Sequence, residues 1–94
     1  MSEQPNPEVV PRERVFLQFV YGIYGQTLVL LGDEEHPATG KKEPPALDDA
    51  RFLIDVLDVL TEKTRGNLTK QEEEALGVLL SQLKMRHFQK RASG

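Results

Sequence analysis

The sequence predicts a small all-α domain, and three observations carry this prediction. Apolar residues recur at helical spacing, and the alternation typical of a strand is absent. Glycines stand where the first two helices should end, and a Thr-x-x-Glu motif stands where the third should begin. A chain of 94 residues has room for one domain. We place this domain at residues 12–91, between a mobile tail of residues 1–11 and a C-terminal tail of residues 92–94.

The first helix is expected over about residues 12–31. Its segment Val15–Gly32 contains no charged residue, although glutamine, threonine, tyrosine and glycine dilute its apolar character. The length reaches the lower limit for a membrane span, but this dilution and the charges on both flanks favour a buried core helix. Gly32 should end the helix, because glycine readily adopts the left-handed conformation found after a helix C-terminus.

The second and third helices are expected over about residues 47–64 and 70–90. Gly66 should end the second helix in the left-handed conformation. Thr69 and Glu72 form a capping box for the third, in which each side chain accepts a hydrogen bond from the backbone N–H of the other residue. The end of the second helix, the turn and the start of the third helix fall within four residues. The two helices should therefore form a tight antiparallel hairpin.

The apolar surface of these helices exceeds what a monomer can bury. The first helix is apolar on all faces, and the second leaves only a narrow polar stripe. Three helices packed as a monomer bury one stripe each, and monomers rarely expose large apolar patches. We therefore predict a homo-oligomer, most simply a dimer, with the first helix at or near the interface. The residues expected in this interface are Phe16, Phe19, Val20, Ile23, Tyr24, Leu28, Phe52, Val56 and Val59.

The composition narrows the chemistry that the chain can perform. The absence of cysteine excludes disulfides, thiolate metal sites and a cysteine nucleophile, and the net charge of −3 argues against nucleic acid as the main partner. Neither His36 nor His87 has a second metal ligand of the histidine type at helical spacing. No catalytic triad, phosphate loop or nucleotide-binding motif is evident. We expect a cytoplasmic protein, because no signal peptide is visible, with no enzymatic activity, cofactor or metal.

Two groups of polar residues are candidate interaction surfaces. One lies at the turn before the third helix, and it is either a small binding surface or a solvated turn. The other lies towards the end of the third helix, where it either contacts phosphates or an anionic membrane surface, or only compensates the helix dipole. The connection 32–45 is either a functional loop or a solvated linker. The candidate residues are Lys63, Arg65 and Asn67 in the first group and Lys84, Arg86 and Lys90 in the second.

Several strings in the chain are shared with a known family. They include Leu28–Gly32, Pro37–Lys41, Leu83–Arg86 and above all Lys63–Thr69, KTRGNLT, which precedes a leucine-rich helix. In these strings the chain resembles the bacterial domain of unknown function 1844 family over about residues 16–88. The resemblance implies a small bacterial helical protein and brings no catalytic residues. One departure is the Pro-Pro-Ala before the second helix, where the family tends to have an acidic cap.

The leading hypothesis is a non-enzymatic, homo-oligomeric helical module that interacts with itself and with an unidentified protein partner. One alternative is a protein associated with RNA or DNA through the basic end of the third helix. A further alternative is association with a membrane through the first helix.

Overall fold

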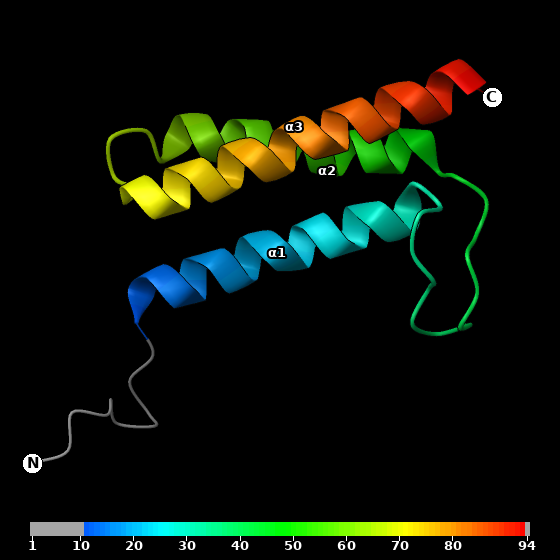
Figure 1. Ribbon diagram of the computed structural model, residues 1–94, viewed down its shortest axis with the longest axis horizontal. Helices are drawn as coiled ribbons and strands as arrows, with labels where there is room; N and C mark the ends of the chain where they lie inside the picture. Colours follow the sequence, from blue (N-terminus) through cyan, green and yellow to red (C-terminus); the bar gives the residue numbers. More distant parts are fainter. Residues whose placement is uncertain (1–10, 94) are drawn as a thin grey trace, which may run out of the picture.

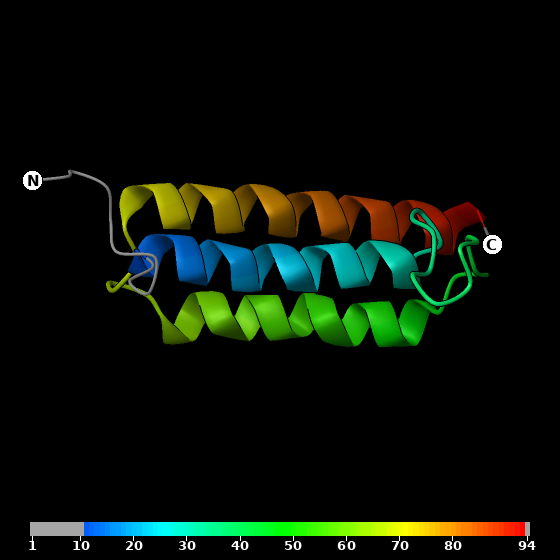
Figure 2. The same cartoon turned by 90° about the horizontal axis from the view of Figure 1, so that it is seen from below.

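Three α-helices make up the described part of the chain. The computed structural model describes residues 11–93, in which α1 spans Arg12–Leu30, α2 spans Leu47–Lys63 and α3 spans Lys70–Ser93. The helices lie side by side in two perpendicular views, with α1 over the line where α2 and α3 meet (Figures 1 and 2). The prediction of an all-α chain with three helices is confirmed.

The core is built from one apolar stripe of each helix. Val20, which the sequence analysis places in an oligomer interface, lies in this core instead, because its side chain is 0% exposed within one chain. Thr27 is buried beside it, and its hydroxyl donates a hydrogen bond to the carbonyl of Ile23 at 2.7 Å, so the buried polar group is satisfied. The buried apolar residues are Val20, Leu31, Ala50, Ile54, Leu57, Leu76, Leu79, Leu80 and Leu83.

The end of α1 is fixed by a Schellman motif. Gly32 has a φ of +81°, as expected for a residue that follows a helix C-terminus. Its N–H donates to the carbonyl of Val29 at 3.0 Å, and the N–H of Asp33 donates to the carbonyl of Leu28 at 2.9 Å. These two bonds satisfy carbonyls that the end of the helix would otherwise leave without a partner.

The connection between α2 and α3 contains the glycine and the capping box that the sequence predicts. Gly66 has a φ of +86°, in the left-handed region as expected, but α2 already ends at Lys63 with Thr64 as its cap, so Gly66 turns the chain two residues beyond the cap. The N–H of Glu72 donates to the Thr69 hydroxyl at 3.1 Å, and the N–H of Thr69 donates to the Glu72 carboxylate at 2.8 Å. The predicted capping box is therefore confirmed. The Thr69 hydroxyl also donates to Glu13, which ties the start of α3 to the first turn of α1.

The ends of the helices differ slightly from the expected ones. α1 ends at Leu30, one residue early, because Leu31 is its cap. α3 continues to Ser93, so residues 92 and 93 are helical and not part of a tail. Nothing in the sequence 91–93 breaks a helix, since neither glycine nor proline occurs there. The expected N-terminal tail lies outside the described residues, apart from Pro11, which caps α1.

The connection between α1 and α2 is a loop whose two ends meet. The N–H of Ala46 donates to the carbonyl of Leu30 at 2.7 Å, which closes the loop at its base. Further out, the N–H of His36 donates to the carbonyl of Lys41 at 2.8 Å, and Glu35 forms an isolated antiparallel bridge with Lys42. The loop therefore projects as a unit beyond the end of α1 (Figure 1).

Three glycine substitutions test whether the left-handed glycines after α1 and between α2 and α3 stabilise the fold. A left-handed backbone costs a non-glycine residue about 1–2 kcal/mol, so Gly66→Ala should lower the free energy of unfolding by that amount. Gly32→Ala should cost more, because its added Cβ would also lie 2.9 Å from the backbone carbonyl oxygen of Glu43. Gly22→Ala is the matched control inside α1, where nothing lies within 4 Å of the added Cβ.

Urea denaturation of the three variants provides the measurement. Gly22→Ala should raise the free energy of unfolding by about 0.5–1 kcal/mol, because alanine restricts the unfolded chain and favours the helix. An equal decrease in the free energy of unfolding for Gly32→Ala and Gly66→Ala would contradict the close contact with Glu43.

Candidate functional site

Three basic residues of α3 face carboxylates of the other elements. The Lys84 ammonium lies 3.1 Å from Asp58 of α2. Arg86 lies 3.4 Å and Lys90 2.9 Å from Asp33, which follows α1. These three cations thus hold α3 to its neighbours, and the geometry does not gather them into one phosphate-binding surface.

Asp33 is the best shielded of these carboxylates. Its side chain is only 17% exposed, whereas that of Asp58 is 41% exposed. Charges that are partly shielded from water interact more strongly than charges on an open surface. The Asp33 pairs should therefore fix the end of α1 against α3 more firmly than the Asp58 pair fixes α2.

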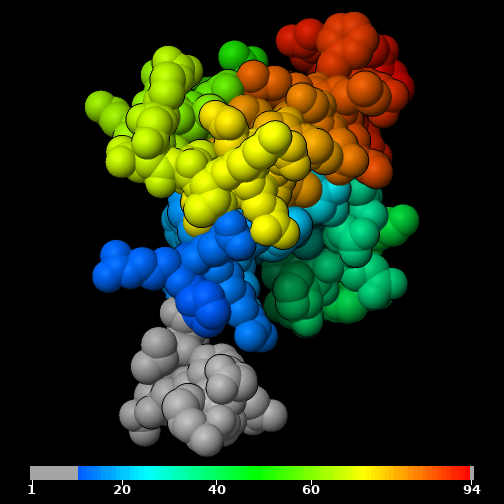
Figure 3. All heavy atoms as spheres, turned by 60° about the vertical axis from the view of Figure 1, so that its left-hand side comes forward, coloured from blue at the N-terminus to red at the C-terminus, as the bar shows by residue number. Residues whose placement is uncertain are grey.

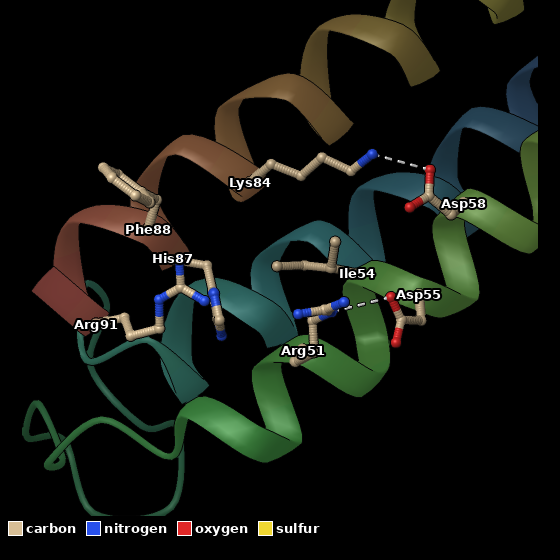
Figure 4. Close-up of a pocket in the computed structure, with 8 residues that line it drawn as sticks. All are labelled: Arg51, Ile54, Asp55, Asp58, Lys84, His87, Phe88 and Arg91. Carbon is tan, nitrogen blue, oxygen red and sulfur yellow. Dashed lines mark hydrogen bonds and ion pairs between the residues drawn. The ribbon is translucent and has the colours of Figure 1, made fainter.

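A groove of about 320 Å³ lies between α2 and α3 (Figure 4). Arg51 and Asp55 of α2 pair across one turn at 3.2 Å, and the Lys84–Asp58 pair lies further along the groove. At the other end, the Arg91 guanidinium lies over the Phe88 ring at 5.6 Å from its centroid. Opposite charges therefore compensate one another along this groove, which has mixed polar and apolar walls.

His87 has a structural role at the bottom of this groove. Its Nε2 lies 3.1 Å from the carbonyl oxygen of Leu47, in the first turn of α2. A carbonyl only accepts hydrogen bonds, so Nε2 carries the proton and donates. The ring thereby links α3 to the start of α2. In residues 11–93 no three or more histidine, aspartate or glutamate side chains are grouped to hold a metal ion.

The six candidate polar residues fall into two separate places. Lys63, Arg65 and Asn67 are exposed at the connection between α2 and α3, at one end of the bundle. The segment Lys84–Lys90 lies about 20 Å or more further along α3, at 1.5 Å per residue. The space-filling view shows the first end of the bundle, where the start of α3 (yellow) lies against the start of α1 (blue) (Figure 3). The structure thus does not combine the two groups into one surface.

The apolar residues expected at an oligomer interface divide into three sets. Val20 is in the core, as described above, and Phe16, Ile23, Tyr24 and Leu28 are half-buried and pack against the core. Val56 is also half-buried. Phe19, Phe52 and Val59 are 49–66% exposed. Exposed apolar residues outside that expectation are Val15, Tyr21, Val78, Met85 and Phe88.

Exposed apolar side chains of α1 and α2 lie on a common face of the bundle, which we call the α1–α2 face. Tyr24 of α1 donates to Gln82 of α3, and Asp58 of α2 pairs with Lys84 of α3. These contacts identify the flank of each helix that faces α3. At 100° per residue, the opposite flanks carry Val15 and Phe19 of α1 and Phe52, Val56 and Val59 of α2. The periodicity of α2 predicts that Phe52, Val56 and Val59 share one side of the helix. By contrast, Val15 could be assigned to the α1–α2 face only once the side of α1 that faces the core was known.

A second hollow, of about 780 Å³, lies between α1 and the loop 32–46. Tyr21, Gly25 and Leu28 line it from the helix, and His36 and Pro37 line it from the loop. The His36 ring is held by its own backbone, since its Nδ1 accepts the N–H of Ala38 at 3.0 Å. No sequence signal marks this hollow, because it depends on how the loop folds back.

The helices bear on the alternative of a membrane span. Although α1 is the most apolar helix of residues 11–93, no helix there has the length and hydropathy that a bilayer crossing requires.

Comparison with known proteins gives one match. A family model described as "Domain of unknown function (DUF1844)" matches residues 13–89. No curated protein and no solved structure matches the chain. The match covers all three helices nearly completely, so the strings that suggest this family in the sequence belong to one continuous match.

The Asp33 pairs yield a prediction for stability. Asp33→Asn should lower the free energy of unfolding by about 1 kcal/mol, because two cations lose one shielded carboxylate. Asp58→Asn is the matched control and should cost about 0.5 kcal/mol or less, because its single pair is more exposed. Urea denaturation at low and high salt measures both. An equal loss in the two variants would contradict the special position of Asp33.

Proposed function

The chain belongs to the domain of unknown function 1844 family, and on this premise we propose that it is a non-enzymatic interaction module whose first partner is a second copy of itself. In this proposal α2 and α3 act as one antiparallel hairpin, supported by their ion pair and by their adjacent course in Figures 1 and 2. α1 packs along the hairpin and completes the surface that a second copy would contact.

One observation carries the proposal, namely the exposed apolar side chains of the α1–α2 face. Val15, Phe19, Phe52 and Val59 are 49–66% exposed in the single chain. Burying a large apolar side chain contributes about 1.5–3 kcal/mol relative to leaving it exposed, so covering this face is favourable. A second copy is the simplest cover, because a twofold pair uses the same surface on both chains.

The adaptor role extends this proposal to a different protein. Surfaces outside such a dimer would contact that protein, and the hollow beside the loop 32–46 is such a surface, because α1 and the loop line it and no residue of α2 does. Affinity capture that recovers only the chain itself, under conditions that preserve weak complexes, would remove the adaptor role and leave self-association in place.

Self-association predicts a specific mutational result. Light scattering behind a sizing column should give a multiple of the single-chain mass for the wild type. Phe52→Glu should shift the protein to the single-chain mass, because it places a charge in the buried centre of the contact. The fold should survive, since this side chain is 66% exposed.

Met85→Glu is the matched control for this experiment. Met85 is 61% exposed on the outward side of α3, so its replacement should leave the mass unchanged. A wild type that stays monomeric at all accessible concentrations would contradict the proposal. Equal effects of the two substitutions would contradict the assignment to the α1–α2 face.

The nucleic-acid alternative has its own test. The ion pairs of α3 count against it, because Lys84, Arg86 and Lys90 already face carboxylates. We expect no salt-dependent binding of labelled RNA or duplex DNA in fluorescence anisotropy. Binding that weakens with salt and disappears when these three cations become glutamine would favour the alternative.

A further inference from the structure

The outward flank of α2 carries a stripe with the spacing of a helix–helix seam. Its residues follow one another at intervals of three, four, three and four positions, which is the a/d spacing of packed helices. The stripe lies on the flank of α2 away from Asp58, whose pair with Lys84 marks the side of α3. Its residues are Asp49, Phe52, Val56, Val59 and Lys63, and we call it the α2 seam.

The two ends of the α2 seam carry opposite charges. Asp49 and Lys63 are both exposed, and they lie seven residues on either side of Val56. Along α2, no residue three or four positions from either of them has the opposite charge. Both charges suit the dipole of their own helix, but neither has a partner at helical spacing.

We propose that the second copy packs antiparallel along the α2 seam, with a twofold axis beside Val56 and Asp49 opposite Lys63 of the partner subunit. The inference rests on the proposed self-association and adds its geometry. A twofold axis makes every contact occur twice, so the two charged ends form two identical ion pairs. The α2 seam from Asp49 to Lys63 extends over about 21 Å, at 1.5 Å per residue, and the apolar residues in its central half would be covered.

Charge favours the antiparallel over the parallel orientation of the two helices. A parallel twofold arrangement would place Asp49 against Asp49 of the partner subunit and Lys63 against Lys63 of the partner subunit. Like charges brought together at an interface are unfavourable, whereas the antiparallel arrangement is complementary at both ends.

The α1–α2 face supports this arrangement at its aromatic residues. Reversal about Val56 brings the region of Phe52 of the partner subunit close to Val59. Phe19 of α1 projects from the same face at this end of the bundle, and it is 56% exposed. Exposed aromatic residues of both helices would then meet across the contact, where aromatic side chains contribute most.

Charge reversal tests the proposed register. Asp49→Lys and Lys63→Asp should each raise the dimer dissociation constant by roughly tenfold or more at low salt, because each creates two like-charge contacts. An equimolar mixture of these two variants should form a heterodimer, since every contact is again between opposite charges. The double variant should recover the wild-type dissociation constant. Glu73→Lys, at an exposed first-turn acid of α3, is the control and should have no effect.

Cysteine cross-linking measures the geometry directly, because the natural chain has no cysteine. Val56→Cys should form a disulfide-linked dimer under mild oxidation, since the axis brings both copies of this residue together. Asp49→Cys and Lys63→Cys should cross-link with each other in a mixture but not with themselves. Circular dichroism of each variant establishes that its helices are intact.

The possible outcomes separate the geometry from the proposed function. A wild-type dimer whose dissociation constant is unaffected by either single charge reversal overturns the antiparallel seam and leaves self-association standing. Self-linking of Asp49→Cys in preference to Val56→Cys also overturns it, in favour of a parallel pair. A wild type that is monomeric at every concentration overturns both.

Discussion

The structure is governed by a limit on what three short helices can bury together. Each helix turns one stripe towards the common core, and α1 carries apolar side chains well beyond that stripe. The apolar side chains that the core does not bury are exposed aromatic and aliphatic residues on the flanks of α1 and α2. The distribution of polar residues follows from the same limit. Arg51, Asp55 and Asp58 of α2 lie towards α3, where ion pairs replace apolar contacts.

Ion pairs contribute to the longitudinal alignment of the bundle, together with the apolar packing of the core. Asp33 contacts two cations of α3 that are one helical turn apart, so α3 cannot slide along α1 without losing at least one of them. The His87 ring adds a link to the first turn of α2. The same cations that suggest a phosphate-binding surface in the sequence therefore serve the alignment of the helices.

The features that could be read from the sequence are those that depend on neighbouring residues. The left-handed conformation of Gly66 and the Thr69–Glu72 box depend on local sequence, and the structure has both as expected. The placement of Val20 could not be read, because a helix that is apolar all round does not reveal which side faces the core.

Contacts between segments that are far apart in the chain could not be predicted from the sequence, for a different reason. The carboxylate of Asp33 and its partners on α3 are more than fifty positions apart, and no local pattern joins them. The hollow beside α1 depends likewise on a loop that folds back.

The closed base of the loop 32–46 separates the distal part of the loop, beyond Asp33, from the bundle. Because the N–H of Ala46 reaches the carbonyl of Leu30, the chain leaves and re-enters the helical body at nearly the same point. The body is therefore insensitive to how far the chain travels in between, and each doubling of such a loop costs only about 0.6 kcal/mol in closure entropy. The distal part of the loop should therefore tolerate replacement by another sequence. It can vary in length, or accept a grafted peptide or a fluorescent label, while the three helices keep their packing.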